Sequence, residues 1–150
     1  MTRVFLSLGS NLGDREALLQ EALRRLEASG VAIVQRSSIR ETEPQDLTDQ
    51  PKFLNMAVEA ATDLSPAELL SRIHVIEAAM GRERTIPKGP RTIDIDILFY
   101  GDTVMETGQL QIPHPRLASR RFVLEPLAEI APGLRHPVTG LTILELLCAA

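Results

Sequence analysis

The order in which strand-like and helix-like apolar patterns follow one another restricts this chain to few folds. Apolar runs of strand period predict strands at residues 3–8, 33–40, 53–61 and 93–100, and apolar residues at helical spacing predict helices at about 14–29 and 66–80. The order strand, helix, strand, strand, helix, strand is that of a split β-α-β unit. We therefore expect an α+β fold, a ferredoxin-like βαββαβ antiparallel sheet with helices packed on one face.

Signals at the ends of these segments sharpen the prediction. Ser65, Pro66 and Glu68 stand where the N-cap, the first helical position and the third helical position of a capping box belong. Polar, proline-containing stretches at 41–51 and 82–91 predict two long loops. Gly9 opens a predicted turn that runs to residue 13 after the first strand.

The last third of the chain predicts smaller elements. We expect a hairpin around Gly108, a helix near 122–130 and a short helix after Leu141. No repeat, low-complexity tract or linker interrupts the sequence, so we expect one domain over residues 1–150.

Composition limits the class of protein. A hydrophobic content of 44% in 150 residues supports a folded core, and no long uncharged apolar run predicts a membrane span. The single cysteine, Cys148, excludes an internal disulfide framework, and no secretory signal is visible, so we expect the cytoplasm. A net charge of −4 disfavours a nucleic-acid partner.

Two aspartates in the last predicted strand are the strongest chemical signal. Asp94 and Asp96 share one face of that strand, while the isoleucines between and beside them share the other. Like charges so placed repel, and a divalent cation offsets the repulsion; Mg²⁺ takes one or two carboxylates together with phosphate oxygens. The alternative is a strand with a wet face, where the carboxylates meet water or arginine, although Asp is a poor strand former.

Basic residues gather near these carboxylates. Arg82, Arg84, Lys88 and Arg91 fall within ten residues, and Arg116, Arg120 and Arg121 form a second group. They indicate either a local anion site or solvated surface arginines. Carboxylate-bound metal beside arginine is typical of phosphoryl transfer, yet no Gly-x-x-x-x-Gly-Lys-Ser/Thr run is present, so a P-loop is excluded.

Three weaker signals remain open on the residues alone. His114, between two prolines, is either a phosphate donor or a turn histidine. Phe53 and Asn55 share a strand face, which suits a planar heterocycle but also an ordinary core. His74 stands three residues before Glu77 on the second helix, facing a ligand or solvent.

Taken together, the motifs resemble the 6-hydroxymethyl-7,8-dihydropterin pyrophosphokinase family almost end to end. The segments that carry the resemblance are 8–13, 50–55, 76–82, 89–98, 113–116 and 120–124. The most specific is the Gly-Pro-Arg-x-x-Asp-x-Asp core that begins at Gly89. The resemblance implies transfer of a diphosphate from ATP to the hydroxymethyl group of the pterin, with release of AMP.

The resemblance also implies residue roles. It implies that Asp94 and Asp96 hold two Mg²⁺ ions and that Arg82 and Arg91 neutralise charge as AMP leaves. Residues implied to bind ATP are Leu70, His74, Glu77, Arg84, Ile97, His114 and Arg120. Those implied to bind the pterin are Thr42, Phe53, Asn55 and Phe122, with the ring stacked between the two phenylalanines. The partners are then two small molecules, and we expect a monomer.

Some positions depart from the family pattern, and two other functions compete. Pro87 stands where a basic residue is usual, Lys88 where an aromatic is often found, and Glu43 where some members have proline. These departures bear on loop closure. The competing functions are a non-catalytic ligand-binding module of the same fold and a metal phosphoesterase that needs no pterin.

Overall fold

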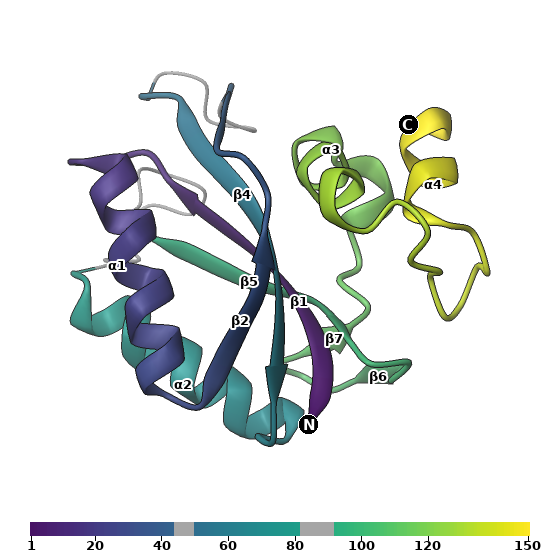
Figure 1. The fold of residues 1–150 in the computed structure, drawn as a ribbon, viewed down its shortest axis with the longest axis horizontal. Helices are drawn as coiled ribbons and strands as arrows, with labels where there is room; N and C mark the ends of the chain where they lie inside the picture. The colour runs from purple at the N-terminus through teal and green to yellow at the C-terminus, as the bar shows by residue number, and fades with distance from the viewer. Residues whose placement is uncertain (44–49, 82–91) are drawn as a thin grey trace.

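A five-stranded antiparallel sheet forms the centre of the molecule (Figure 1). The computed structural model describes residues 1–43, 50–81 and 92–150. The strands are β1 (Thr2–Ser10), β2 (Val31–Arg36), β3 (Arg40–Thr42), β4 (Phe53–Thr62) and β5 (Asp94–Tyr100). Their order is β2-β4-β1-β5, with β3 also paired to β4, and every pairing is antiparallel. This order is that of a ferredoxin-like sheet, so the predicted fold class is confirmed.

The two long predicted helices cover one face of this sheet (Figure 1). Helix α1 (Arg15–Ala28) begins at Asp14, whose carboxylate accepts from the backbone N–H of Ala17 at 3.2 Å. Helix α2 (Pro66–Ala79) begins with the predicted capping box of Ser65 and Glu68, with Pro66 in its first turn. The core beneath them includes Leu6, Leu8, Leu19, Leu26, Leu69 and Ile73, each at most 1% exposed.

The opposite face of the sheet is also covered, which the sequence did not indicate. Helices α3 (Arg121–Ile130) and α4 (Ile143–Ala149) lie on that side (Figure 1). They enclose a second core with Phe5, Ala57 and Phe99 of the sheet. The reason is visible in β1, where residues 4–10 are all buried, so neither face of that strand is left to solvent.

A β-bulge interrupts the strict alternation predicted for β5. Phe5 pairs with Phe99 and Leu6 with Ile97, so Leu98 is an extra residue. Leu98 and Phe99 consequently both contribute to the second core, whereas Ile97 packs in the first. The alternation prediction is wrong beyond Ile97 but holds for Asp94 and Asp96, which precede the bulge.

The strand predicted at 33–40 is divided into β2 and β3. Ser37 bridges the gap: its backbone N–H donates to the carbonyl of Ala57, and its hydroxyl accepts from the N–H of Ala57, both at 2.9 Å. Residues 41 and 42, expected in a loop, belong to β3, and residues 9 and 10, expected in a turn, belong to β1. The predicted loop at 82–91 lies outside the described residues.

The hairpin expected around Gly108 is present as β6 (Met105–Glu106) and β7 (Gln111–Ile112), followed by the 3-10 helix η1 (Leu117–Ser119). The backbone N–H of His114 donates to the carbonyl of Leu98 at 3.1 Å, which ties the segment after the hairpin to β5. None of the described helices is long and apolar enough to span a membrane.

Removing the predicted cap of α2 should lower stability measurably. We expect Ser65→Ala to reduce the free energy of unfolding by about 1 kcal/mol, because the N–H of Glu68 then loses its acceptor. Urea denaturation measures the change. Ser71→Ala, at an exposed interior position of the same helix, is the matched control and should be neutral or slightly stabilising. Equal losses in both variants would contradict the capping role.

Candidate active site

The two carboxylates of β5 face the same side of the sheet as the second core. In the pairing of β1 with β5, Asp94 lies opposite Gly9 and Asp96 lies opposite Ser7. Residues that lie opposite one another in antiparallel strands point to the same face. Both aspartates are half-buried there, at the end of β5 that follows the undescribed segment 82–91.

The residues predicted to bind a heterocycle lie on that same face. Gly9 lies opposite Asn55 in the pairing of β1 with β4, and Thr42 lies opposite Phe53 in the pairing of β3 with β4. The side-chain amide of Asn55 donates to the hydroxyl of Thr42. Asp94 is therefore two strands away from Asn55, with Gly9 between them.

Gly9 is required by the close approach of Asn55. A Cβ atom on residue 9 would stand 2.9 Å from Oδ1 of Asn55 and 3.6 Å from the ring of Phe53. The first distance is shorter than real Cβ contacts allow. The missing side chain thus lets the Asn55 side chain approach the backbone of β1 in the middle of this face, next to the strand that carries the carboxylates.

The start of α3 stands over this face. Phe122, in its first turn, is half-buried against the second core, and the guanidinium of Arg120 lies 5.5 Å from the centre of the Phe122 ring. A cation over an aromatic ring at this distance is attracted by its π-electrons, which helps to hold both side chains. Arg120 and Phe122, predicted as phosphate and ring contacts, are neighbours.

Beyond the free edge of β5, helix α2 and the β6–β7 hairpin enclose a cavity of about 390 Å³. Its lining includes seven of the predicted site residues: Leu70, His74, Glu77, Asp94, Asp96, Ile97 and His114. A neighbouring cavity of about 450 Å³ shares Leu70 and His74. Five of the residues predicted to bind ATP, namely Leu70, His74, Glu77, Ile97 and His114, are thus brought together at one edge of the sheet, whereas Arg120 does not line this cavity.

Glu77 has a structural role in addition to lining this cavity. It is 3% exposed, and its carboxylate accepts the backbone N–H of Ile95 at 3.0 Å. That N–H points outward from β5, which is an edge strand among the described residues, so a side chain satisfies it in place of a further strand. The carboxylate therefore anchors α2 to β5 beside Asp94.

His114 is neutral in this structure at physiological pH. Burial, with Arg120 and Arg116 nearby, lowers its pKa to about 4, although Asp94 acts in the opposite direction. Its Nδ1 accepts the backbone N–H of Arg116 at 3.2 Å. A neutral imidazole that accepts at Nδ1 carries its proton on Nε2, so His114 offers one hydrogen-bond donor.

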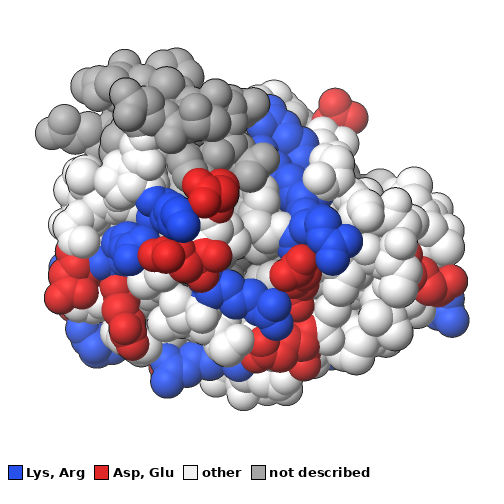
Figure 2. All heavy atoms as spheres, turned by 90° about the horizontal axis from the view of Figure 1, so that it is seen from above, with Lys and Arg blue, Asp and Glu red and all other residues white. Residues whose placement is uncertain are grey.

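The carboxylate pair fits a Mg²⁺ site completed by a ligand. In the ranges 1–43, 50–81 and 92–150, no three His, Cys, Asp or Glu side chains gather into a ligand set. Mg²⁺ is usually bound by one or two carboxylates together with substrate phosphates and water, so a pair on one face suffices. Figure 2 shows acidic and basic side chains interspersed over the visible surface.

Three predicted residues lie outside the described part of the chain: Arg82, Arg84 and Arg91. In contrast, sequence reasoning missed Asn11, which is fully buried and whose amide donates to Gln50 Oε1 at 2.9 Å and to the carbonyl of Pro51 at 3.0 Å. These bonds hold the segment that enters β4 just before Phe53. A polar residue directly after a buried strand was the available signal.

Comparison with known proteins agrees with this geometry. The sheet order and the packing of helices on both faces define a ferredoxin-like α+β domain. The chain matches the 7,8-dihydro-6-hydroxymethylpterin-pyrophosphokinase (HPPK) family over residues 5–132, and it belongs to this family.

Two relatives and one structure illustrate the similarity. The chain is 47% identical over 137 residues to the 2-amino-4-hydroxy-6-hydroxymethyldihydropteridine pyrophosphokinase of Bacillus subtilis, covering 91% of this chain and 82% of that protein. It is 44% identical over 140 residues to the folic acid synthesis protein fol1 of Pneumocystis carinii, covering 93% of this chain but only 19% of that protein. The structure of Plasmodium falciparum HPPK-DHPS with pteroate superposes with a TM-score of 0.80 at 19% identity, over 99% of this chain and 42% of that one, which shows the shared fold.

Filling the space at residue 9 should disturb the site. We expect Gly9→Ala to lower the free energy of unfolding by about 1–3 kcal/mol, because the new methyl group must displace the Asn55 amide. Urea denaturation measures the loss, and NMR of the Asn55 side-chain amide reports the displacement. Gly133→Ala, where nothing lies within 4 Å, is the control and should not destabilise. An unchanged Asn55 signal in Gly9→Ala would contradict the close approach.

The low pKa of His114 has a measurable consequence. Its imidazole should titrate near pH 4 in the free protein instead of near pH 6.5, as followed by NMR with His114→Gln for assignment. Between these two values the unfolded chain binds the proton more readily, so this residue's contribution to stability is present above pH 6.5 and is lost as the pH falls towards 4. A midpoint near 6.5 would show that the ring is not held in a desolvated, cationic environment.

Proposed function

We propose that this chain transfers a diphosphate from ATP to the hydroxymethyl group of 6-hydroxymethyl-7,8-dihydropterin and releases AMP, as a step in folate biosynthesis. The observation that carries the proposal is the row of Asp94, Gly9 and Asn55 across three adjacent strands, within a chain of the HPPK family. This row puts a carboxylate pair and a heterocycle-binding amide on one face, at the distance of two strand spacings.

Asp94 and Asp96 would hold the metal, with two Mg²⁺ ions in our proposal. When bound, the metal supplies positive charge to the transferred phosphates and to the attacking oxygen. The described residues provide the carboxylates, and the family resemblance supports ATP phosphates as the remaining ligands.

The chain's own residues would then orient both substrates. The Asn55 amide, held by Thr42, would present Oδ1 as an acceptor to the edge of the pterin, and Phe53 and Phe122 would contact its faces. Leu70 and Ile97 offer apolar walls for the nucleotide in the cavity beside β5. His74 and Glu77 line the same cavity.

The ATP phosphates would accept hydrogen bonds from one neutral donor, His114, and from cationic arginine side chains. His114 donates through Nε2 without a change of protonation, and Arg120, held over Phe122, supplies charge. Our proposal adds three further cationic side chains to these phosphate ligands, Arg82, Arg84 and Arg91, and it does so from the family resemblance alone. In-line displacement needs little more than positioning and charge neutralisation, which such a set provides.

Two further attributes remain proposals. A cytoplasmic location is supported by the single cysteine, Cys148, which is free and exposed. The expected monomer stays a prediction.

Removing one carboxylate should abolish turnover more than pterin binding. We expect Asp94→Asn to reduce AMP formation at least about 100-fold, because charge on the transferred phosphates is no longer offset, while pterin affinity changes little. Mass spectrometry of products from ATP, Mg²⁺ and hydroxymethyldihydropterin measures the reaction. Asp102→Asn, an exposed aspartate just beyond β5, is the matched control.

The same assay separates the competing functions. A phosphoesterase would release phosphate or diphosphate without a pterin product, and a binding module would form no product at all. Undiminished AMP formation by Asp94→Asn would contradict the proposed site.

A further inference from the structure

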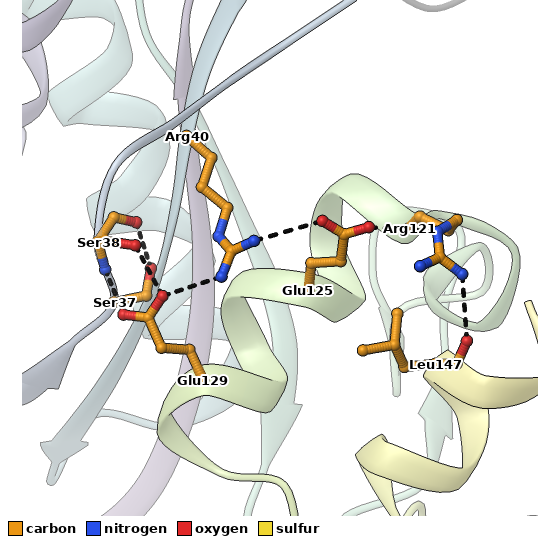
Figure 3. A network of polar contacts seen from close by, with 7 residues as sticks. All are labelled: Ser37, Ser38, Arg40, Arg121, Glu125, Glu129 and Leu147. Carbon is orange, nitrogen blue, oxygen red and sulfur yellow. Dashed lines mark hydrogen bonds and ion pairs between the residues drawn. The ribbon is translucent and has the colours of Figure 1, made fainter.

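A polar network joins the edge strand β3 to helix α3 (Figure 3). The guanidinium of Arg40 reaches two carboxylates of α3: Nη1 lies 3.3 Å from Glu125 Oε2, and Nη2 lies 3.1 Å from Glu129 Oε1. Because these glutamates are four residues apart, one arginine spans a full turn of the helix. A lysine has one ammonium group and cannot place two separate nitrogen atoms against the two carboxylates in this way.

Both glutamates are held by additional donors. Glu129 accepts from the backbone N–H of Ser38 at 2.6 Å and from its hydroxyl at 2.7 Å. These bonds, with Arg40, keep the pKa of the Glu129 carboxyl below its usual value, so it is ionised. On Glu125, Oε1 accepts from Nε of Arg121 at 3.2 Å.

The network continues to the last helix. Nη1 of Arg121 donates to the carbonyl of Leu147 in α4 at 3.3 Å (Figure 3). One chain of contacts therefore ties strand β3 to helices α3 and α4, which come about 80 residues or more later in the sequence.

This network adjoins the proposed pterin site on both elements. On α3, Phe122, Glu125 and Glu129 are spaced three and four residues apart and share one stripe of the helix. On β3, Arg40 and Thr42 share one face, and they lie opposite Asn55 and Phe53. Arg40 thus binds Glu125, which lies one helical turn from Phe122 on α3. Arg40 also lies two residues before Thr42, which is opposite Phe53 on β4.

We propose that Arg40 is a positioning residue, which holds α3 against the β3–β4 edge and thereby sets the gap between Phe53 and Phe122. This inference rests on the proposed function, because it assigns the gap to the pterin. The three charged side chains are 34–39% exposed, so water screens the ion pairs partly and the effect should be moderate. It should also be larger for the pterin than for ATP, since the nucleotide cavity lies at the opposite edge of the sheet, beside β5, and only Arg120 of the described ATP residues adjoins α3.

The test compares Arg40→Met with Arg3→Met. Arg3 forms an ion pair of 3.0 Å with Glu59 between strands β1 and β4, without a carboxylate of α3, and is the matched control. We expect Arg40→Met to raise the KM and the dissociation constant for the pterin about three- to tenfold, the size expected from one or two partly exposed ion pairs, with a smaller rise in the KM for ATP. Arg40→Lys should be intermediate, and Arg3→Met should leave both constants unchanged.

The outcomes are distinguishable. An unchanged pterin constant in Arg40→Met, an equal rise for ATP and pterin, or an equal effect of Arg3→Met would overturn the positioning role. Pterin binding is also measured by fluorescence titration, independently of turnover. A wild-type protein that binds pterin but forms no AMP contradicts the proposed function alone, and the Arg40 inference is then decided by the binding constants. A wild-type protein that binds no pterin overturns both.

Discussion

The pairing of β1 with its two neighbours is the constraint on which the rest of the site depends. In this register Gly9 lies between Asn55 of β4 and Asp94 of β5. A shift of one residue would turn every side chain of a strand to the other face, placing the carboxylates in the apolar core beneath α1 and α2. The apolar residues that alternate with them fix the register: Leu6 and Leu8 in β1, and Ile95 and Ile97 in β5 all pack in that core. The fold and the site are therefore specified by the same alternation.

The electrostatics of the site follow from its position between two layers. Carboxylates lie on the sheet face, and cationic side chains come from the segments that cover it, as with Arg120 before α3. A half-buried, neutral His114 between these charges is a consequence of desolvation and neighbouring arginines, which lower its pKa. An acidic protein thus keeps a local set of donors suited to phosphate without an overall basic surface.

Much of the fold could be predicted because local signals agreed with one another. The sequence predicts the capping box at Ser65, the helical spacing of the apolar residues and the order of the strands, and all three are present in the structure. The bulge at Leu98 and the break at Ser37 were not, because both arise from how a strand fits its neighbours. The face that Asp94 and Asp96 share was predictable from alternation, whereas the Arg40 network joins residues about 85–90 positions apart and has no local signature.

The most direct test of the account is where a metal–nucleotide complex binds relative to the described strands. Mn²⁺ accepts the same oxygen ligands as Mg²⁺ and broadens NMR signals of nearby nuclei, so it can be added with a non-hydrolysable ATP analogue. The account predicts that amide signals of β5 at Asp94 and Asp96 and of β1 at Gly9 broaden most, while those of β2 and α4 remain sharp. Broadening centred on other elements, or equal broadening in Asp94→Asn, would contradict a metal site on these carboxylates.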